Sequence, residues 1–432
     1  MSDLKVGIAG LGTVGTAVIR MLERRADALA LDTGRRLVVT AVSARNRSRD
    51  RGIDLSACAW FEDPVALARE ADIDVFVELM GGAGDPARTA VAAALDRGLP
   101  VVTANKALLA ACGVDLARRA EASGAGLYFE AAVAGGIPIV KTLRESLSGN
   151  VVERVSGILN GTCNYILTRM AEEKLGFDTC LAEAQRLGYA EADPTFDIDG
   201  FDTAHKLAIL TSLAFGTQVD ADAIYVEGIR QLTLADLDAA DDLGYRIKLL
   251  GVALRTETGI EQRVHPTMVP KHWPIAQVSG VLNAVAVDGD AVNLTLVGPG
   301  AGGDATASAV VGDLADVARG VQGFAFGLPA QALARAERAP MQRHEGGYYI
   351  RLAVVNKPGT AAIIAGRMAD EHISLESIVQ RRPGGSSHAA ETANVLLITY
   401  ATTEAAVRRA IAAIEAEGVV ASVPQVIRIE KD

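Results

Sequence analysis

One stretch of the chain, residues 188–206, gathers side chains that can bind cations or move protons. It ends on Lys206, and the carboxylates before that lysine are Glu191, Asp193, Asp197, Asp199 and Asp202. Asp202 and Lys206 are four residues apart, so in a helix they share one face and can form a charge-assisted pair. A lysine oriented in this way can donate and accept a proton. The alternative explanations of the spacing are an N-capping Asp202 and a surface ion pair.

A second lysine, Lys106, follows a short apolar run at residues 101–103. If that run is a strand of a parallel sheet, Lys106 lies at the carboxyl edge, where such sheets bind ligands. From there it would reach both a nicotinamide and a substrate. An exposed lysine at the start of a helix explains the position equally well.

The segment Gly10-Leu11-Gly12-Thr13-Val14-Gly15 has the spacing of a dinucleotide-binding loop. Its first glycine allows a tight turn, its second lets backbone N–H groups approach a pyrophosphate, and its third lets a helix pack closely on a strand. An apolar run at residues 4–9 precedes the segment, and a helical pattern follows it. We therefore expect it to bind a dinucleotide, with a simple packing turn as the alternative.

The end of the second apolar run, residues 37–42, bears on the choice between NAD and NADP. An acid at this point favours the free ribose hydroxyl of NAD, and none is present. Ser43 and Arg45 stand there instead, and a guanidinium suits the 2′-phosphate of NADP. NADP is the expected cofactor and NAD the alternative, although a solvated loop also explains most of the arginines at 45–51.

These residues need elements to position them. Apolar runs at residues 4–9, 37–42, 75–79 and 101–103 alternate with helical patterns, which predicts an α/β fold with a Rossmann-type parallel sheet. Gly81 follows the third run, and Gly302 lies in a glycine-rich loop before an apolar helix at 305–318. We expect both glycines to contact the cofactor, and the helix to return to the first sheet.

The chain divides accordingly into several units. We expect a Rossmann-type domain at 1–134 with a returning segment at about 300–325, an α+β catalytic and dimerisation domain at 135–299, and a linker at 326–347. Residues 348–432 read β-α-β-β-α-β, which is the ferredoxin-like plan.

Composition excludes several classes of protein. Half of the 432 residues are hydrophobic and 22% are charged, a balance typical of a globular fold. The net charge of −11 has the wrong sign for a nucleic-acid partner. No apolar run approaches the ~20 residues of a membrane span, and no signal peptide begins the chain, so we expect a cytoplasmic protein with no membrane partner.

Several blocks, in order, resemble the homoserine dehydrogenases. They are the glycine loop, Asn105-Lys106-Ala107-Leu108, and residues 129–138, 157–167 and 187–206. Residues after Tyr348 resemble the ACT domain that follows the catalytic part in many bacterial members. The resemblance implies NAD(P)-dependent interconversion of L-homoserine and L-aspartate 4-semialdehyde, in the biosynthesis of threonine, methionine and isoleucine.

The same resemblance implies roles for single residues. Lys206 matches the family's general acid and base, Asp202 the carboxylate beside it, and Lys106 the lysine between cofactor and substrate. Glu191 matches the residue that binds the substrate amino group, and Asp197 a further substrate-site acid. Hydride addition to an aldehyde builds negative charge on its oxygen, which a lysine can stabilise and protonate.

A metal site is also implied. Glu130, Val133, Gly135 and Ile137 match the family's site for a monovalent cation such as sodium, built largely from backbone carbonyls. Oxygen donors suit a hard cation. Without the resemblance, Glu130 is explained as a charge at the end of a strand.

The C-terminal segment predicts regulation. The pathway makes L-threonine the leading effector, with Asn356-Lys357-Pro358-Gly359 as its ligand loop. A homodimer or homotetramer is expected. The sequence leaves open the number of subunits, the ratio of NADP to NAD use, the effector and whether the cation site is filled.

Two other functions fit parts of the chain. Cys163 could be the thiolate of an aldehyde dehydrogenase, but no histidine or basic cluster adjoins it in the sequence. A non-enzymatic dinucleotide-binding regulator with an amino-acid-sensing ACT domain is the alternative function, and it leaves the cluster at 191–206 without a purpose.

Overall fold

Six parallel strands form the first sheet of the structure, a computed structural model that describes residues 3–381 and 392–430. Their order, β3-β2-β1-β4-β5-β6, is that of a dinucleotide-binding sheet. The strands are β1 (Asp3–Ala9), β2 (Arg36–Ser43), β3 (Ala59–Phe61), β4 (Val75–Glu78), β5 (Val101–Thr103) and β6 (Leu127–Tyr128). The predicted parallel sheet is confirmed. The sequence does not predict β3 and β6, strands of three and two residues, whereas it predicts the equally short β5 from the apolar run at 101–103.

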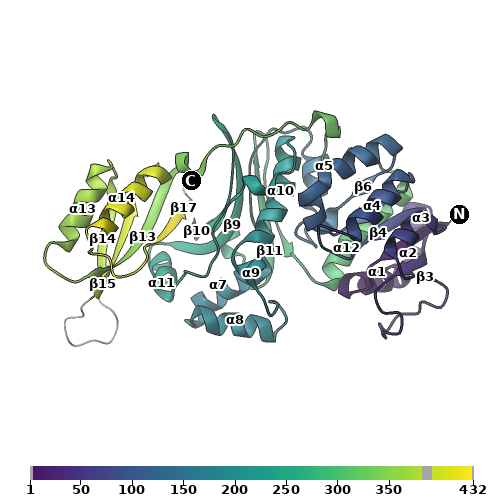
Figure 1. The fold of residues 1–432 in the computed structure, drawn as a ribbon, viewed down its shortest axis with the longest axis horizontal. Coiled ribbons are helices and arrows are strands. Elements are labelled where there is room, and N and C mark those ends of the chain that lie inside the picture. Colours follow the sequence, from purple (N-terminus) through teal and green to yellow (C-terminus); the bar gives the residue numbers. More distant parts are fainter. Residues whose placement is uncertain (1–2, 382–391, 431–432) are drawn as a thin grey trace.

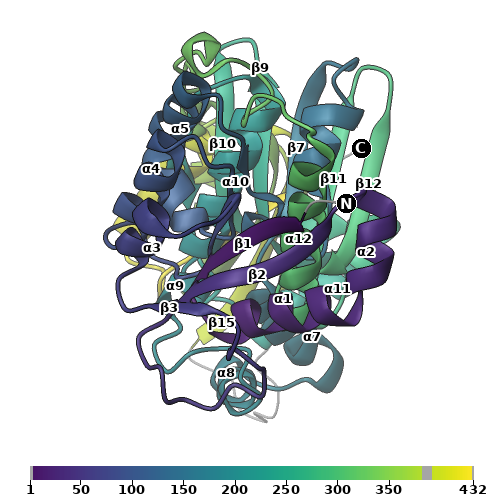
Figure 2. The same ribbon diagram turned by 90° about the vertical axis from the view of Figure 1, so that its right-hand side faces the viewer.

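Helices cover both faces of this sheet (Figure 2). On one face, Val18 and Leu314 from two different helices share a core with Ile8 of β1. On the other face, Phe76 of β4 packs with Leu95 and Leu109. The helices are α1 (Thr13–Arg24), α2 (Ala26–Thr33) and α12 (Gly303–Arg319) on the first face, and α3 (Pro64–Glu70), α4 (Ala87–Asp96) and α5 (Lys106–Ser123) on the second. Since α12 packs beside α1, the chain returns to its first sheet after building the middle of the protein (Figure 1).

The middle of the chain forms a mixed sheet covered by helices. Its strands are β7 (Val152–Ile158), β8 (Tyr225–Val226), β9 (Tyr245–Thr256), β10 (Gly259–Pro270), β11 (Leu282–Gly289) and β12 (Asn293–Pro299). Its helices are α6 (Ile139–Lys141), α7 (Gly161–Glu173), α8 (Phe177–Arg186), α9 (Thr195–Ile198), α10 (Phe201–Phe215) and α11 (Leu234–Asp242). Helix α6 begins at Ile139, and the chain continues from it as a wider turn over Thr142–Ser146.

The C-terminal strands extend the same mixed sheet. Residues 320–344 contain only short turns, and then follow β13 (Glu345–Val355), α13 (Thr360–Asp370), β14 (Leu375–Arg381), β15 (Thr392–Thr399), β16 (Thr402–Thr403), α14 (Glu404–Ala416) and β17 (Gln425–Ile429). The order β17-β13-β15-β14 gives the predicted ferredoxin-like plan. Strand β17 also pairs with β10, through Thr267 with Arg428 and Met268 with Ile429, which joins the two parts.

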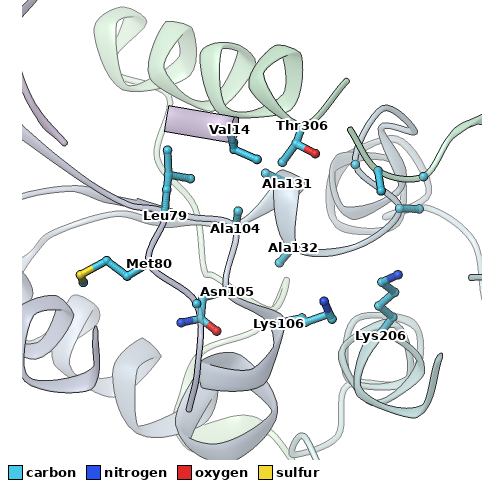
Figure 3. Close-up of a pocket in the computed structure, with 15 residues that line it drawn as sticks. Val14, Leu79, Met80, Ala104, Asn105, Lys106, Ala131, Ala132, Lys206 and Thr306 are labelled. Atoms are coloured by element: carbon cyan, nitrogen blue, oxygen red, sulfur yellow. The ribbon is translucent and has the colours of Figure 1, made fainter. Parts of the chain in front are cut away.

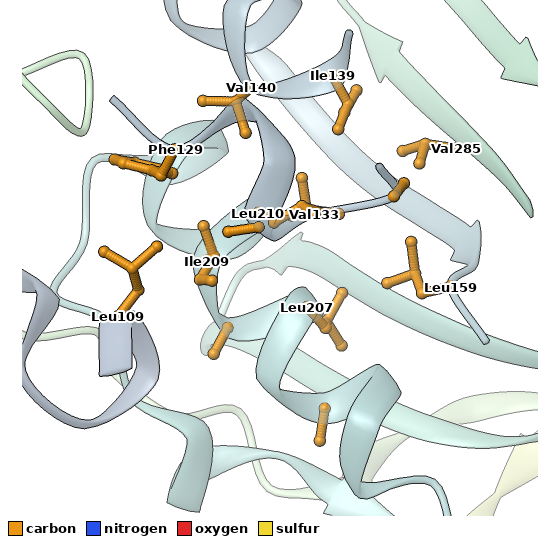
Figure 4. Packing of buried hydrophobic residues seen from close by; sticks show 14 of the residues in the cluster. Leu109, Phe129, Val133, Ile139, Val140, Leu159, Leu207, Ile209, Leu210 and Val285 are labelled. Atoms are coloured by element: carbon orange, nitrogen blue, oxygen red, sulfur yellow. The ribbon is translucent and has the colours of Figure 1, made fainter. Parts of the chain in front are cut away.

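A hydrophobic core lies between the two sheets and holds α5 against α10 (Figure 4). Leu109 of α5 lies in one cluster with Leu207 and Ile209 of α10, and Phe129 and Val133 from the connecting loop join it. This packing sets the position of α5 relative to α10. Among residues 3–381 and 392–430, no helix is long and apolar enough to cross a membrane.

Candidate active site

A cleft of about 270 Å³ lies at the carboxyl ends of β1, β4 and β5 (Figure 3). Val14 of α1 and Thr306 of α12 line one end, and Lys106 and Lys206 face each other at the other end. Other wall residues lie at 79–81, 104–105, 131–135 and 300–301. The two lysines singled out from the sequence therefore share one cleft with the helix that follows the glycine loop.

The glycine loop has the geometry that a pyrophosphate requires. Gly10 adopts φ +106°, and a Cβ there would lie 2.5 Å from the carbonyl oxygen of Leu79. A Cβ on Gly15 would lie 2.0 Å from the carbonyl oxygen of Gly10. A Cβ on Gly12 would meet nothing within 4 Å, and no side chain caps the helix that starts there. Free N–H groups at a helix start, beside open space, form an anion site.

A second helix start borders the cleft. Gly302 precedes α12 at φ +109° with no side-chain cap, and a Cβ on it would meet nothing within 4 Å. Thr13 packs against this segment, since its Cγ2 lies 3.2 Å from the Cβ position of Gly303. Gly81, at φ +77° in the opposite wall, is equally open. Val14 and Gly81 thus line the same cleft as Ala301, which precedes Gly302.

Ser43 and Arg45 have different surroundings at the end of β2. Ser43 is buried, and its carbonyl accepts the N–H of Gly10 at 2.9 Å. Arg45 is exposed, and no hydrogen bond or ion pair engages its guanidinium within the described ranges of the chain. Arg47 and Arg51 instead lie over the ring of Trp60, at 5.8 and 5.7 Å. Arg45 and Arg49 are thus the arginines of this run whose guanidinium groups have no partner among the described residues.

Asp202 connects the two lysines. Its Oδ2 accepts from Lys206 Nζ at 2.7 Å, and its Oδ1 lies 3.1 Å from Lys106 Nζ. Asn160 Nδ2 donates to Oδ2 at 2.9 Å, and Lys206 Nζ also donates to the carbonyl of Leu159 at 2.6 Å. Asp202 is 4% exposed and Lys206 8%. A surface ion pair is therefore wrong, and so is an N-cap, because the cap position of α10 belongs to Gly200.

This pairing keeps Asp202 ionised. Burial alone would raise the pKa of the Asp202 carboxyl, but the ammonium groups of Lys206 and Lys106 hold it well below its usual range. The Asp202 carboxylate thus pairs with both lysines and fixes the orientation of their side chains. Both ammonium groups therefore share one carboxylate at this end of the cleft.

We call residues 188–200 the acidic loop. Two of its acids, Asp197 and Glu191, have different surroundings. Asp197 accepts from Asn160 Nδ2 at 2.8 Å, and burial together with the charge of Asp202 raises its pKa. Asn160 therefore bridges Asp197 and Asp202, a link that the sequence does not reveal. Glu191 is exposed; its backbone carbonyl accepts from Gln185, and its side chain lies apart from the lysine pair.

Glu78 is a buried acid that sequence reasoning missed. It ends β4 with no exposed surface and accepts from the N–H groups of Met80 at 2.7 Å and Gly81 at 3.1 Å. Thr103 Oγ1 donates to its other oxygen at 2.6 Å. Glu78 therefore ties the loop after β4 to β5. Its place as the one charged residue in the apolar run at 75–79 is the signal that could have drawn attention to it.

Glu130 lies under the loop between the two sheets. It is 4% exposed, and its carboxylate accepts from the N–H groups of Val140 at 2.9 Å and Lys141 at 2.8 Å. Burial raises the pKa of Glu130 to about 7. The Lys141 ammonium turns away toward Asp313 and Asp316. The sequence indicated neither the burial of this acid nor its bonds to the first N–H groups of α6.

The loop above Glu130 is tightly bent. Gly135 adopts φ +34°, and a Cβ there would lie 2.8 Å from the carbonyl of Gly300 in the cleft wall. Val133 and Ile137 are buried beside it. The four residues of the predicted cation site thus lie in one short, buried segment that borders the cleft.

Cys163 has none of the features of a nucleophile. It is fully buried, and its Sγ donates to the carbonyl of Asp197 at 3.3 Å. Burial and the neighbouring carboxylates raise the pKa of its thiol well above the ordinary value. A thiolate mechanism therefore has no support at this position.

Comparisons with known sequences match nearly the whole chain. A family model described as homoserine dehydrogenase matches residues 138–315, and one described as the homoserine dehydrogenase NAD binding domain matches residues 10–130. A homoserine dehydrogenase of Pseudomonas aeruginosa is 45% identical over 441 residues, covering 100% of both chains. One of Neisseria gonorrhoeae is 44% identical over 439 residues, covering 100% of this chain and 99% of that protein.

Solved structures agree with the sequence matches. The crystal structure of a homoserine dehydrogenase from Thiobacillus denitrificans superposes with a TM-score of 0.92 at 44% identity, covering 99% of this chain and 98% of the other. A hyperthermophilic archaeal homoserine dehydrogenase in complex with NADPH gives a TM-score of 0.63 at 28% identity, covering 75% of this chain and 100% of the other.

Proposed function

Because the chain belongs to the homoserine dehydrogenase family, and is thus an oxidoreductase that interconverts L-homoserine and L-aspartate 4-semialdehyde, we propose how its residues divide the work. The proposal rests above all on Asp202, which holds Lys206 and Lys106 together at one end of the cleft. The non-enzymatic regulator considered above is set aside by the family assignment.

Lys206 is the proton donor and acceptor in this proposal. A bound nicotinamide supplies or accepts the hydride. As an aldehyde oxygen gains negative charge, Lys206 Nζ donates a proton to it, and in the reverse direction the neutral amine removes the hydroxyl proton. Lys106, held by the same carboxylate, places a second positive charge beside that oxygen.

The acidic loop binds the amino group of the substrate. Asp197 is held toward the lysine pair by Asn160, and Glu191 lies on the exposed part of the loop, where it can close onto a bound ammonium. Two carboxylates of this kind suit an α-amino acid and reject an uncharged alcohol.

NADP is the proposed cofactor, with NAD as a weaker one. The open N-terminus at Gly12 suits the pyrophosphate, and the free guanidinium of Arg45 suits the 2′-phosphate. A direct test assays the purified protein with homoserine and each cofactor in turn. Turnover with homoserine, faster with NADP, is the expected result, and turnover confined to NAD would contradict the cofactor assignment.

A sodium-like cation fits the segment at Glu130. The buried carboxylate, the pKa of which burial raises, faces no lysine or arginine ion pair among the described residues, so a monovalent cation would balance its charge. Carbonyls of Val133, Gly135 and Ile137 would supply further oxygen ligands. The cation would hold this bend against the cleft wall.

Residues 348–432 are proposed to form an ACT domain that binds L-threonine. Gly359, at φ +95°, starts α13 without a side-chain cap, which leaves backbone N–H groups for a ligand carboxylate. Adding millimolar threonine to the full chain should lower activity or shift the melting temperature. If threonine changes neither, the C-terminal unit has another ligand or serves assembly into a homodimer or homotetramer.

We also retain the division of the chain as a proposal: 1–134 with about 300–325, 135–299, a linker at 326–347, and 348–432. Two cores that each lie within one unit support it, one around Val6 and Leu314 and another around Tyr348 and Val407. A third core, which contains Leu109, Leu207 and Tyr349, crosses the boundaries.

A further inference from the structure

A buried arginine of the last strand connects the C-terminal domain to the middle domain. Arg428 of β17 is 1% exposed and donates to Glu404 of α14, from Nη2 at 2.6 Å and from Nε at 3.1 Å. It also pairs with Glu227, just after β8, and lies 5.4 Å from the ring centroid of Tyr225. Glu227 is far from Arg428 in sequence and belongs to a different domain.

The segment that begins at Glu227 continues onto the acidic loop. A Cβ on Gly228 would lie 2.4 Å from the carbonyl oxygen of Ile198, so only glycine fits this approach. The next residue, Ile229, donates its N–H to that same carbonyl at 2.9 Å. Backbone therefore packs directly on backbone at α9.

Side chains strengthen the same contact. Arg230 Nε pairs with Asp199 Oδ1 at 2.5 Å, and its Nη2 donates to Thr195 Oγ1 at 3.1 Å. Thr195 and Asp199 flank Asp197, the acid that Asn160 holds toward the lysine pair. Residues 227–230 thus touch α9 on one side and Arg428 on the other.

We propose that Arg428 is a positioning residue for the acidic loop and that it acts through residues 227–230. The proposal rests on the function assigned above to Asp197 as a substrate-binding acid. When Arg428 holds Glu227, α9 stays where Asp197 can meet the substrate ammonium. Movement of β17 would be transmitted to the same acid without touching the dinucleotide loop.

Two variants of the full chain test this. Arg428→Met removes the buried part of the anchor and leaves Glu227 paired with Arg408 at 2.9 Å. Glu227→Gln weakens both pairs while Arg428 keeps Glu404. Both should raise the KM for homoserine by about two- to thirtyfold, the usual range for a coupling through packed elements, with kcat and the NADPH dissociation constant within about twofold of the parent.

Arg351→Met is the matched control. Arg351 Nε pairs with Asp236 of α11 at 2.7 Å, so it crosses the same domain boundary without meeting residues 227–230. It should lower the melting temperature and leave the KM for homoserine unchanged. If Arg351→Met raises that KM as much as the other two, the effect is general loosening of the boundary and the proposal is overturned.

A fourth variant separates this inference from the proposed function. Asp197→Asn should raise the KM for homoserine on its own account. If it does so while Glu227→Gln leaves the KM unchanged, the coupling proposal fails and the substrate assignment stands. If Asp197→Asn has no effect, the substrate assignment itself is wrong. Should Arg428→Met not fold, Glu227→Gln decides the question.

Discussion

Replacing Lys206 by methionine removes the proposed proton donor with little change of shape. The variant keeps an unbranched side chain in α10 but loses the bonds to Asp202 and to the carbonyl of Leu159. Asp202 would still be 3.1 Å from Lys106 Nζ and 2.9 Å from Asn160 Nδ2. No buried charge is left unpaired, so the protein should fold.

Two magnitudes follow from these contacts. A general acid and base contributes ~10²- to 10⁴-fold in rate, which corresponds to about 3–5 kcal/mol of the activation free energy. Breaking a buried ion pair commonly costs ~3–5 kcal/mol of stability, and because Lys106 remains with Asp202 we expect less, about 1–3 kcal/mol. The variant should therefore remain folded, and the fall in its turnover should come from the missing proton donor and not from unfolding.

Three measurements separate the two effects. Steady-state kinetics with homoserine and NADP give kcat, fluorescence titration gives the NADPH dissociation constant, and thermal unfolding gives stability. We expect kcat to fall at least a hundredfold, a factor typical of a lost general acid, with NADPH affinity within a few-fold of the parent.

Lys248→Met is a matched control for this variant. Lys248 is another buried lysine, 5% exposed on β9, and it donates to the Asn164 side chain at 3.1 Å, away from the cleft. Its loss should lower the melting temperature but keep kcat. Turnover of Lys206→Met within a few-fold of the parent would refute the assignment of Lys206.

Three further predictions concern the cofactor and cation sites. Arg45→Ala should weaken the binding of NADP by ~1.5–3 kcal/mol, the worth of a charged hydrogen bond, and leave the binding of NAD unchanged. Arg47→Ala should change the binding of neither cofactor. If Arg45→Ala weakens the binding of both cofactors equally, the residue only shapes the loop. Because the folded-state pKa of Glu130 is raised to about 7, its carboxylate destabilises the folded state above pH 7 and this cost disappears as the pH falls toward 4.5. Sodium should therefore raise the melting temperature more at pH 8 than at pH 6, compared with a choline salt, and Glu130→Gln should abolish the difference. Glu78→Gln weakens the acceptor for the N–H groups of the loop after β4, so fluorescence titration should show weaker NADPH binding by ~1–3 kcal/mol, and unchanged affinity would show that the loop keeps its shape without this charge.

Much of the fold could be read from the sequence because its signals are local. The apolar run at residues 4–9, the glycines at 10 and 12 and the helical pattern after them all belong to one continuous segment, and they became β1, the loop and α1. The C-terminal βαββαβ order was visible for the same reason. The short strands β3 and β6 were missed, whereas β5, which is also three residues long, was predicted from its apolar run at 101–103.

The site was predicted only in part, because contacts between distant residues have no local pattern. The spacing of Asp202 and Lys206 indicates a pair, yet the spacing cannot say whether that pair is buried. Nothing near Asn160 in the sequence shows that it bridges Asp197 and Asp202.

The sequence by itself determined the family, the chemistry and the order of the elements, since these depend on residue types at short spacings. Tertiary structure alone decided which of those residues meet. Packing of α5 on α10 brings Lys106 to the far side of the Asp202 carboxylate, and pairing of β17 with β10 brings Arg428 to Glu227. These contacts between distant residues depend on how the buried apolar faces of the whole chain pack together. The spacing of residues along the sequence does not contain that information.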